Sequence, residues 1–133
     1  MNNALNLIGR LLIAALFLPA GLAKLSGFEG TVGYITSVGL PLPTVAAAVA
    51  LAVEVLGSVA LIVGFQTRIA AAVLAVFTVV ASVFFHAFWA AAPEQAFVQQ
   101  LLFFKNIGVI GGLLVLVSSG AGAWSLDAKK AAQ

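Results

Sequence analysis

Five side chains that can carry a charge or a proton lie within or beside apolar stretches of this 133-residue chain: Arg10, Lys24, Glu54, His86 and Lys105. The sequence has one histidine and no cysteine. It therefore lacks the ligands for a bis-histidine haem, an iron–sulfur cluster or a cysteine-type zinc site. The chemistry open to these residues is proton transfer by Glu54 or His86, with hydrogen bonding or ion pairing by the basic side chains.

The composition identifies the solvent around these residues. Only 8% of the residues are charged, 63% are hydrophobic, and the mean hydropathy is +1.19. A soluble domain carries about 25% charged residues, so an ordinary soluble enzyme and a disordered chain are both excluded. The net charge is only +2, with no run of Lys or Arg to follow a phosphate backbone, which argues against a nucleic-acid binder. A lipid bilayer is the solvent that suits this chain.

Nucleotide and hydrolase motifs are also missing from the sequence, including Gly-x-Gly-x-x-Gly, the P-loop, HExxH and GxSxG. We therefore expect no covalent cofactor and no metal site. A redox role would need a bound quinone or a partner subunit to carry the electrons.

The sequence predicts an all-α integral membrane protein, a bundle of four transmembrane helices in a single domain. A spanning helix needs about 20 mostly apolar residues, and the apolar stretches show no alternation of the kind found in β-barrel strands. The predicted spans are residues 5–23, 44–64, 69–90 and 101–117, followed by a tail at 118–133.

The connections between these spans differ in kind. Residues 65–68 form a tight turn, for which Gly64 is the expected C-cap and Thr67 the expected N-cap. The longer first connection can hold a short helix near residues 31–38 at the membrane surface.

Positive charges predict the orientation of the chain. An even number of spans brings both termini and the turn at 65–68 to one side. That side carries four of the six basic residues, Arg10, Arg68, Lys129 and Lys130. The positive-inside rule therefore predicts that both termini are cytoplasmic.

Helical spacing predicts which faces of the spans point inward, because residues three and four apart share one face. The stripe of the first span is Arg10, Ala14, Phe17, Gly21 and Lys24. The stripe of the second span is Glu54, Gly57, Ser58 and Leu61. The stripe of the third span is the most polar and consists of Thr78, Ser82, His86 and Trp89.

Together the stripes predict a pocket in the outer half of the bundle. Glu54 lies near the midplane, and His86 and Lys105 lie about 6 Å below the outer ends of their spans. We take Glu54 and His86 as the catalytic candidates. The ligand-binding candidates are Lys105, Asn106, Lys24, Trp89, Ser82 and Arg10.

Aromatic residues gather around the third connection and can form flat walls for a ring-shaped ligand near His86 and Lys105. An outer aromatic belt with core filling explains them equally well. The residues are Phe84, Phe85, Phe88, Trp89, Phe97, Phe103 and Phe104.

The polar candidates have structural interpretations that stay open at this point. Glu54 can pair with Arg10 or with a lysine to hold the bundle together. Arg10 and Lys24 can extend to lipid headgroups. His86 can bond to Ser82 or to a carbonyl.

Asn106 can act as a hydrogen-bonded link between helices. Small residues spaced four apart also favour close helix packing, and the sequence has two such pairs, Gly108 with Gly112 and Ala71 with Ala75.

The order and spacing of several short segments resemble the DoxX family of small bacterial and archaeal membrane proteins. Ala121 departs from the family's tail, which carries a proline at this point. The matching segments are residues 9–12, 20–25, 39–43, 54–57, 64–68, 86–89, 104–106 and 120–127.

This resemblance implies a four-helix protein of the inner membrane. The family is named for a subunit linked to quinone-coupled sulfur oxidation, and other members are associated with redox-stress assemblies. No catalytic motif is generally agreed for it, so the resemblance leaves open whether the chain is an enzyme.

The leading hypothesis is an accessory or quinone-binding subunit of a membrane oxidoreductase system, acting with a partner subunit or as a homo-oligomer. Two alternatives remain. One is a small-molecule transporter or exporter that uses Glu54, and the other is a non-catalytic membrane scaffold for partner proteins.

Overall fold

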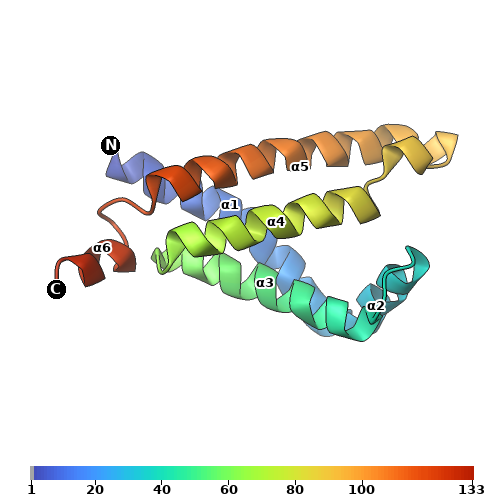
Figure 1. The fold of residues 1–133 in the computed structure, drawn as a ribbon, viewed down its shortest axis with the longest axis horizontal. Coiled ribbons are helices and arrows are strands. Elements are labelled where there is room, and N and C mark those ends of the chain that lie inside the picture. The colour runs from blue at the N-terminus through green and yellow to red at the C-terminus, as the bar shows by residue number, and fades with distance from the viewer. Residues whose placement is uncertain (1) are drawn as a thin grey trace.

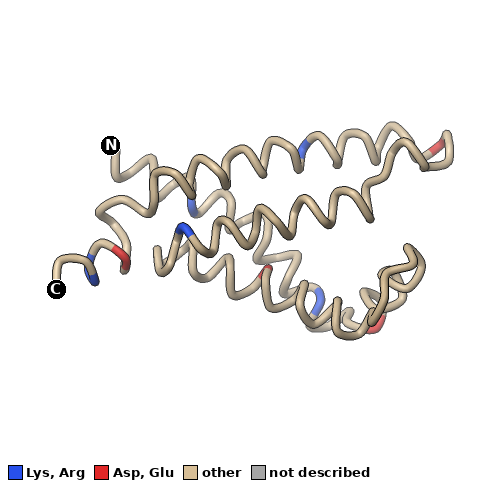
Figure 2. The backbone as a smooth tube through the Cα atoms, in the orientation of Figure 1, with Lys and Arg blue, Asp and Glu red and all other residues tan. Residues whose placement is uncertain are grey.

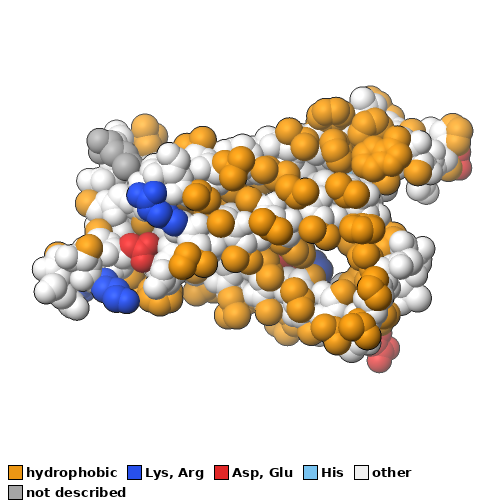
Figure 3. Space-filling model, viewed as in Figure 1, with side chains coloured by type: hydrophobic (Ala, Val, Ile, Leu, Met, Phe, Trp, Pro, Cys, Tyr) orange, Lys and Arg blue, Asp and Glu red, His pale blue; other side chains and the backbone are white. Residues whose placement is uncertain are grey.

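A computed structural model describes residues 2–133, and within this range it is helical (Figure 1). Four helices are long and apolar enough to cross a membrane, which confirms the four predicted spans. They are α1 (Asn3–Ser26), α3 (Pro43–Val63), α4 (Thr67–Phe85) and α5 (Pro93–Ser119). Large apolar side chains cover much of the surface between the two ends, as lipid contact requires (Figure 3).

Three shorter elements complete the fold. The helix α2 (Phe28–Ser37) is the short helix expected near residues 31–38. A 3₁₀ turn, η1 (Phe88–Ala90), follows α4, and a short helix, α6 (Leu126–Ala131), lies in the tail.

The long helices form two packed pairs. Helix α1 packs against α3, α4 packs against α5, and the contact between α3 and α4 joins the pairs. Both termini and the α3–α4 turn lie at one end of the bundle, which we call the terminal end (Figure 1). Helix α2 and the α4–α5 connection lie at the other, which we call the loop end.

One predicted boundary at the loop end is wrong. The third candidate span ends at Ala90 as predicted, with α4 stopping at Phe85 and η1 completing it, but α5 begins at Pro93 instead of residue 101. Pro93 occupies the first turn of α5, where proline's missing N–H is harmless, but the polar residues after it lowered the local hydropathy. As a result Lys105 lies about 18 Å along α5 from its start, near the middle of the helix.

The apolar core occupies the terminal half of the bundle and draws on all four long helices. Its alanines confirm the predicted packing pair in α4. The core residues are Phe17, Leu61, Ala71, Leu74, Ala75, Leu113 and Leu116.

Glycine packing differs from the prediction for α5. A Cβ atom on Gly108 would meet nothing within 4 Å, and one on Gly112 would only approach Ile13, at 3.9 Å. The close approach is instead at Gly21 of α1, where a Cβ atom would lie 2.8 Å from Cγ2 of Val55 and 2.9 Å from Cβ of Glu54. Helices α1 and α3 therefore touch backbone to backbone beside Glu54.

Candidate functional site

An ion pair between Lys24 and Glu54 lies at the centre of the candidate site. The nitrogen Nζ of Lys24 is 2.5 Å from Oε1 of Glu54, and the two side chains are 23% and 5% exposed. Gly21, one turn before Lys24, permits the helix contact that sets this distance. Of the charge partners considered for Glu54, a lysine is therefore correct and Arg10 is not.

A cavity of about 440 Å³ opens from this ion pair toward the loop end. We call it the Glu54 cleft. Figure 3 shows the molecule hollowed between the α2–α3 side and the α4–α5 side. Its walls are mostly apolar, and its charged or polar lining residues are Lys24, Thr31, Tyr34, Glu54, Thr78, His86, Lys105 and Asn106. The structure thus brings together five of the eight predicted site residues.

His86 lies at the C-terminal end of α4 and bonds to a residue that the sequence did not single out. Its Nδ1 is 2.9 Å from Oε1 of Gln99 in α5. Because an amide oxygen only accepts, Nδ1 is the donor in this bond, which leaves Nε2 of the neutral ring as an acceptor. The expected bond to Ser82 exists only through the backbone, where the N–H of His86 donates to the carbonyl of Ser82 at 3.1 Å.

Asn106 and Ser82 link α5 to α4 at the edge of the cleft. Nδ2 of Asn106 donates to Oγ of Ser82 at 3.1 Å, and Oγ of Ser82 donates to the carbonyl of Thr78 at 2.7 Å. All three residues are buried. This is the interhelical link considered for Asn106, and it leaves Ser82 outside the cleft lining.

Lys105 also lines the cleft, but unlike Asn106 it is exposed. Its side chain makes no hydrogen bond or ion pair with residues 2–133. The amide next to it, on Asn106, faces Ser82 instead. Lys105 is therefore available to a ligand.

The aromatic walls of the cleft are not the predicted ones. Trp89 is 59% exposed and packs on Phe88 and Phe103, with ring centroids 5.2 and 5.5 Å away, outside the cleft lining. Of the seven predicted aromatic residues only Phe85 lines the cleft. The other aromatic residues of the lining are Phe17, Tyr34 and Phe77, which a local count of aromatics could not reveal.

Arg10 is far from the cleft and does not extend to headgroups, because it is completely buried at the terminal end. Its guanidinium donates to the carbonyls of Leu61 at 2.8 Å, Ile62 at 3.2 Å and Trp124 at 2.5 Å, and to Oδ1 of Asn6 at 2.9 Å. The last turn of α3 leaves carbonyls without helical partners, and Arg10 satisfies them. It is a structural residue here.

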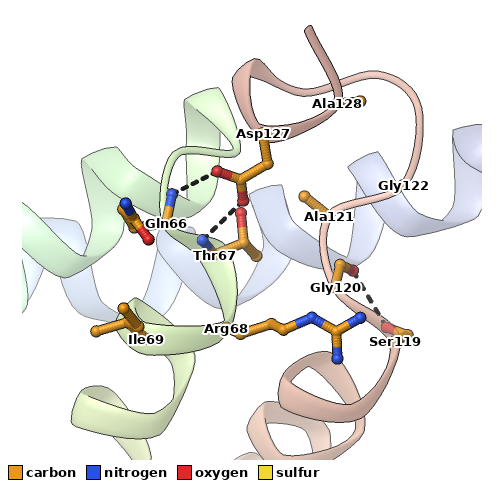
Figure 4. Close-up of a pocket in the computed structure, with 10 residues that line it drawn as sticks. All are labelled: Gln66, Thr67, Arg68, Ile69, Ser119, Gly120, Ala121, Gly122, Asp127 and Ala128. Carbon is orange, nitrogen blue, oxygen red and sulfur yellow. Dashed lines mark hydrogen bonds between the residues drawn. The ribbon is translucent and has the colours of Figure 1, made fainter. Parts of the chain in front are cut away.

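A second cavity, of about 490 Å³, lies at the terminal end where the tail folds back on the α3–α4 turn (Figure 4). The carboxylate of Asp127 accepts from the N–H groups of Gln66 at 2.7 Å and Thr67 at 2.9 Å. The expected N-cap, Thr67, is therefore wrong, because the cap of α4 comes from the tail. Arg68 closes α5 by donating to the carbonyls of Val117 and Ser118.

The pKa of the Asp127 carboxyl reflects this cap. Partial burial raises the pKa. The hydrogen bonds from Thr67 and Gln66 and the charge of Arg10 together lower the pKa by more than burial raises it, so the pKa lies below its ordinary value. Because the two charged residues that line this second cavity, Arg68 and Asp127, both bond to helix ends, it is a structural junction. The Glu54 cleft is the candidate site.

Comparison with known proteins identifies a family of membrane proteins. The family model DoxX matches residues 5–87. Inner membrane protein YphA of Escherichia coli is 35% identical over 91% of this chain and 86% of its own length. Inner membrane protein YqjF of the same organism is 36% identical over 91% of this chain and 88% of its length.

A more distant relative is the Surfeit locus protein 4 homolog of Drosophila melanogaster, 27% identical over 97% of this chain and 42% of that protein. No solved structure matches the chain. The chain therefore belongs to the DoxX family and is a multi-pass inner membrane protein related to YphA and YqjF.

Proposed function

We propose that this protein binds a quinone or quinol in the Glu54 cleft, as the quinone-binding or accessory subunit of a membrane oxidoreductase system. The observation that carries the proposal is the cleft itself. It has a volume of about 440 Å³, mostly apolar walls and a few convergent polar groups. Small-molecule sites typically have about 300–1,000 Å³ and this kind of lining.

The residues of the cleft fit a quinone head. Tyr34, Phe77 and Phe85 supply rings against which a flat molecule can pack. Lys105 can donate a hydrogen bond to a carbonyl oxygen, and Nε2 of His86 can accept one from a hydroxyl. A quinone bound here would supply the two-electron chemistry that the side chains of this protein cannot.

The protein's own part is to bind, orient and exchange protons. His86 is held by Gln99, so its Nε2 is the first proton acceptor. Glu54 lies deeper and is held by Lys24, which places a second acceptor at the floor of the cleft. The electrons would pass to or from a partner oxidoreductase subunit, because the side chains of this protein, in one copy or several, do not carry electrons.

The proposal includes the orientation of the protein in the membrane. Arg68, Lys129 and Lys130 lie at the terminal end, which the positive-inside rule places in the cytoplasm. The cleft then opens in the outer half of the membrane. Since the chain has no cysteine, Ala132→Cys gives a single label site. The tail should react with an impermeant maleimide only after the cells are opened.

The test of quinone binding uses purified protein in nanodiscs and titration with a short-chain ubiquinol. His86→Ala and Lys105→Ala should each weaken binding by roughly tenfold or more, as expected for the loss of one hydrogen bond to a charged or polar group. Lys130→Ala, in the tail, is the matched control and should bind as wild type does. Absence of binding by the wild type, or unchanged binding by both cleft variants, would overturn the proposal.

Proton-coupled transport is a second candidate, because the cleft ends at a carboxylate in the middle of α3, as sites of such carriers do. The apolar core closes the terminal half, so transport would require the two helix pairs to separate. Flux in proteoliposomes that persists unchanged in Glu54→Gln would remove this role.

A further inference from the structure

We infer that the ligand of the Glu54 cleft is an acidic amphiphile, an apolar body with one ionised oxygen that pairs with Lys105. The inference rests on the proposed function for the place of the site and narrows the class of ligand. Among ring compounds, the cleft should therefore bind those with an ionised hydroxyl more tightly than neutral ones.

The charges lining the cleft do not balance. Lys24 and Glu54 neutralise each other at 2.5 Å, and the carboxylate is almost fully enclosed. His86 bonds to the uncharged amide of Gln99. The positive charge of Lys105 is therefore left without a counter-charge in the cleft lining.

Other acidic side chains in the described part of the chain do not supply that counter-charge. Asp127 caps α4 at the terminal end. Glu94 lies eleven residues before Lys105, about 16 Å away along α5. Glu29 belongs to α2 and is not part of the cleft lining.

Lys105 also lies near the middle of α5, about 18 Å from the start of the helix and about 21 Å from its end at Ser119. A charged side chain within a membrane-spanning helix is costly unless it meets an anion or water. A ligand that brings an anionic oxygen into the cleft removes this cost, and a neutral ligand does not.

The remaining walls suit the apolar part of such a ligand. Leu16, Val49, Phe77 and Phe85 are among the apolar residues that line the cleft. The apolar walls beside Lys105 favour an amphiphile over a free inorganic anion, which would gain nothing from the apolar lining.

Three probes of matched length separate ring recognition from acid recognition. The first is an alkyl hydroxynaphthoquinone whose hydroxyl is ionised at neutral pH, and the second is its O-methyl ether, which has no acidic oxygen. The third is a fatty acid with the same alkyl chain. Binding is measured in nanodiscs of phosphatidylcholine with wild type, Lys105→Met, Lys105→Arg and the control Lys130→Met.

We expect wild type to bind the ionised naphthoquinone roughly 10- to 100-fold tighter than its ether, the range of one charge-assisted hydrogen bond. This preference should vanish in Lys105→Met and remain in Lys105→Arg and Lys130→Met. Lys105→Met removes a charge from a span, so it should fold; thermal unfolding of each variant verifies this, and Lys105→Gln serves as a second neutral variant.

Other outcomes separate the two proposals. Equal binding of both naphthoquinones by wild type overturns the inference and leaves the proposed function standing. Lys105-dependent binding of the fatty acid, with neither naphthoquinone bound, supports the inference and overturns the quinone function. Failure of all three probes to bind overturns both.

Discussion

Lys24 and Glu54 join the last turn of α1 to the middle of α3 through an ion pair whose atoms Nζ and Oε1 are 2.5 Å apart. The partners are unequally enclosed, since the lysine side chain is 23% exposed and the carboxylate side chain 5%. This asymmetry decides what happens when either partner is removed, and it gives the first prediction.

Lys24→Met should destabilise the protein more than Glu54→Gln. The first change leaves a buried carboxylate without its counter-ion, at a cost of about 3 kcal/mol in the free energy of unfolding. The second leaves a lysine near the end of α1 that can extend toward the headgroups, so it should cost only about 1 kcal/mol. Unfolding in mixed micelles, followed by circular dichroism, measures both values.

The double variant Lys24→Met/Glu54→Gln is the control for this reasoning. It removes both charges together, and its free energy of unfolding should lie within about 1 kcal/mol of wild type. This loss is much smaller than the sum of the two single losses. Additive losses would show that the two residues act independently and would contradict an ion pair at this place.

Arg10→Lys should destabilise the protein by about 3 kcal/mol although it keeps the charge. A lysine cannot reproduce the planar fork that serves the carbonyls of Leu61, Ile62 and Trp124, and buried carbonyls would lose their partners. The tail should then become more sensitive to protease. The matched control is Arg68→Lys, whose bonds are exposed and whose loss should cost about 1 kcal/mol or less.

The cap of α4 by Asp127 predicts a pH dependence of tail docking. The pKa of this carboxyl is lowered in the folded protein, because the bonds from Thr67 and Gln66 and the charge of Arg10 outweigh the effect of burial. A lowered folded pKa means that the stabilisation is complete above the ordinary carboxyl pKa of about 4 and is lost as the pH falls below it. Hydrogen exchange of residues 120–133 should therefore accelerate below about pH 4.

Asp127→Asn tests the assignment. It should lose about 1 kcal/mol at neutral pH, the usual contribution of a helix cap, and show no further change on acidification. Glu94→Gln, in the first turn of α5, should keep the acid response of the tail. An unchanged acid response in Asp127→Asn would assign the effect to another group.

The helical period explains which parts of this architecture the sequence could predict. Four residues of the α1 stripe and Glu54, Ser58 and Leu61 of the α3 stripe are buried as expected, because a straight helix repeats every 3.6 residues whatever it packs against. The gathering of Glu54, Lys24 and Lys105 at one cleft followed from those faces.

Contacts between distant segments were beyond such reasoning. The cap of α4 comes from Asp127, sixty residues after Thr67, and no local pattern marks that pairing. Gln99 reaches His86 only because α5 starts at Pro93, in a polar stretch that hydropathy assigns to a loop. The prediction of the aromatic walls was wrong for the same reason. Trp89 of η1 and Phe103 of α5 pack against each other and do not line the cleft.

Gly21 and Gly108 give the last prediction, because they look alike in sequence and differ in packing. A Cβ on Gly21 would meet Val55 and Glu54 at under 3 Å, whereas one on Gly108 would meet nothing within 4 Å. Gly21→Ala should therefore force α1 away from α3 at a cost of about 2 kcal/mol and stretch the ion pair of Lys24. Gly108→Ala should be neutral or stabilise by up to about 1 kcal/mol, because alanine favours the helix.

Thermal unfolding in one detergent measures both glycine variants, and the ligand titration supplies the second readout. Gly21→Ala should also weaken binding in the Glu54 cleft, since the cleft floor depends on the contact between α1 and α3, while Gly108→Ala should not. Equal stability of the two variants would mean that α1 and α3 do not approach at Gly21, and the position of Lys24 at the floor of the cleft would lose its support.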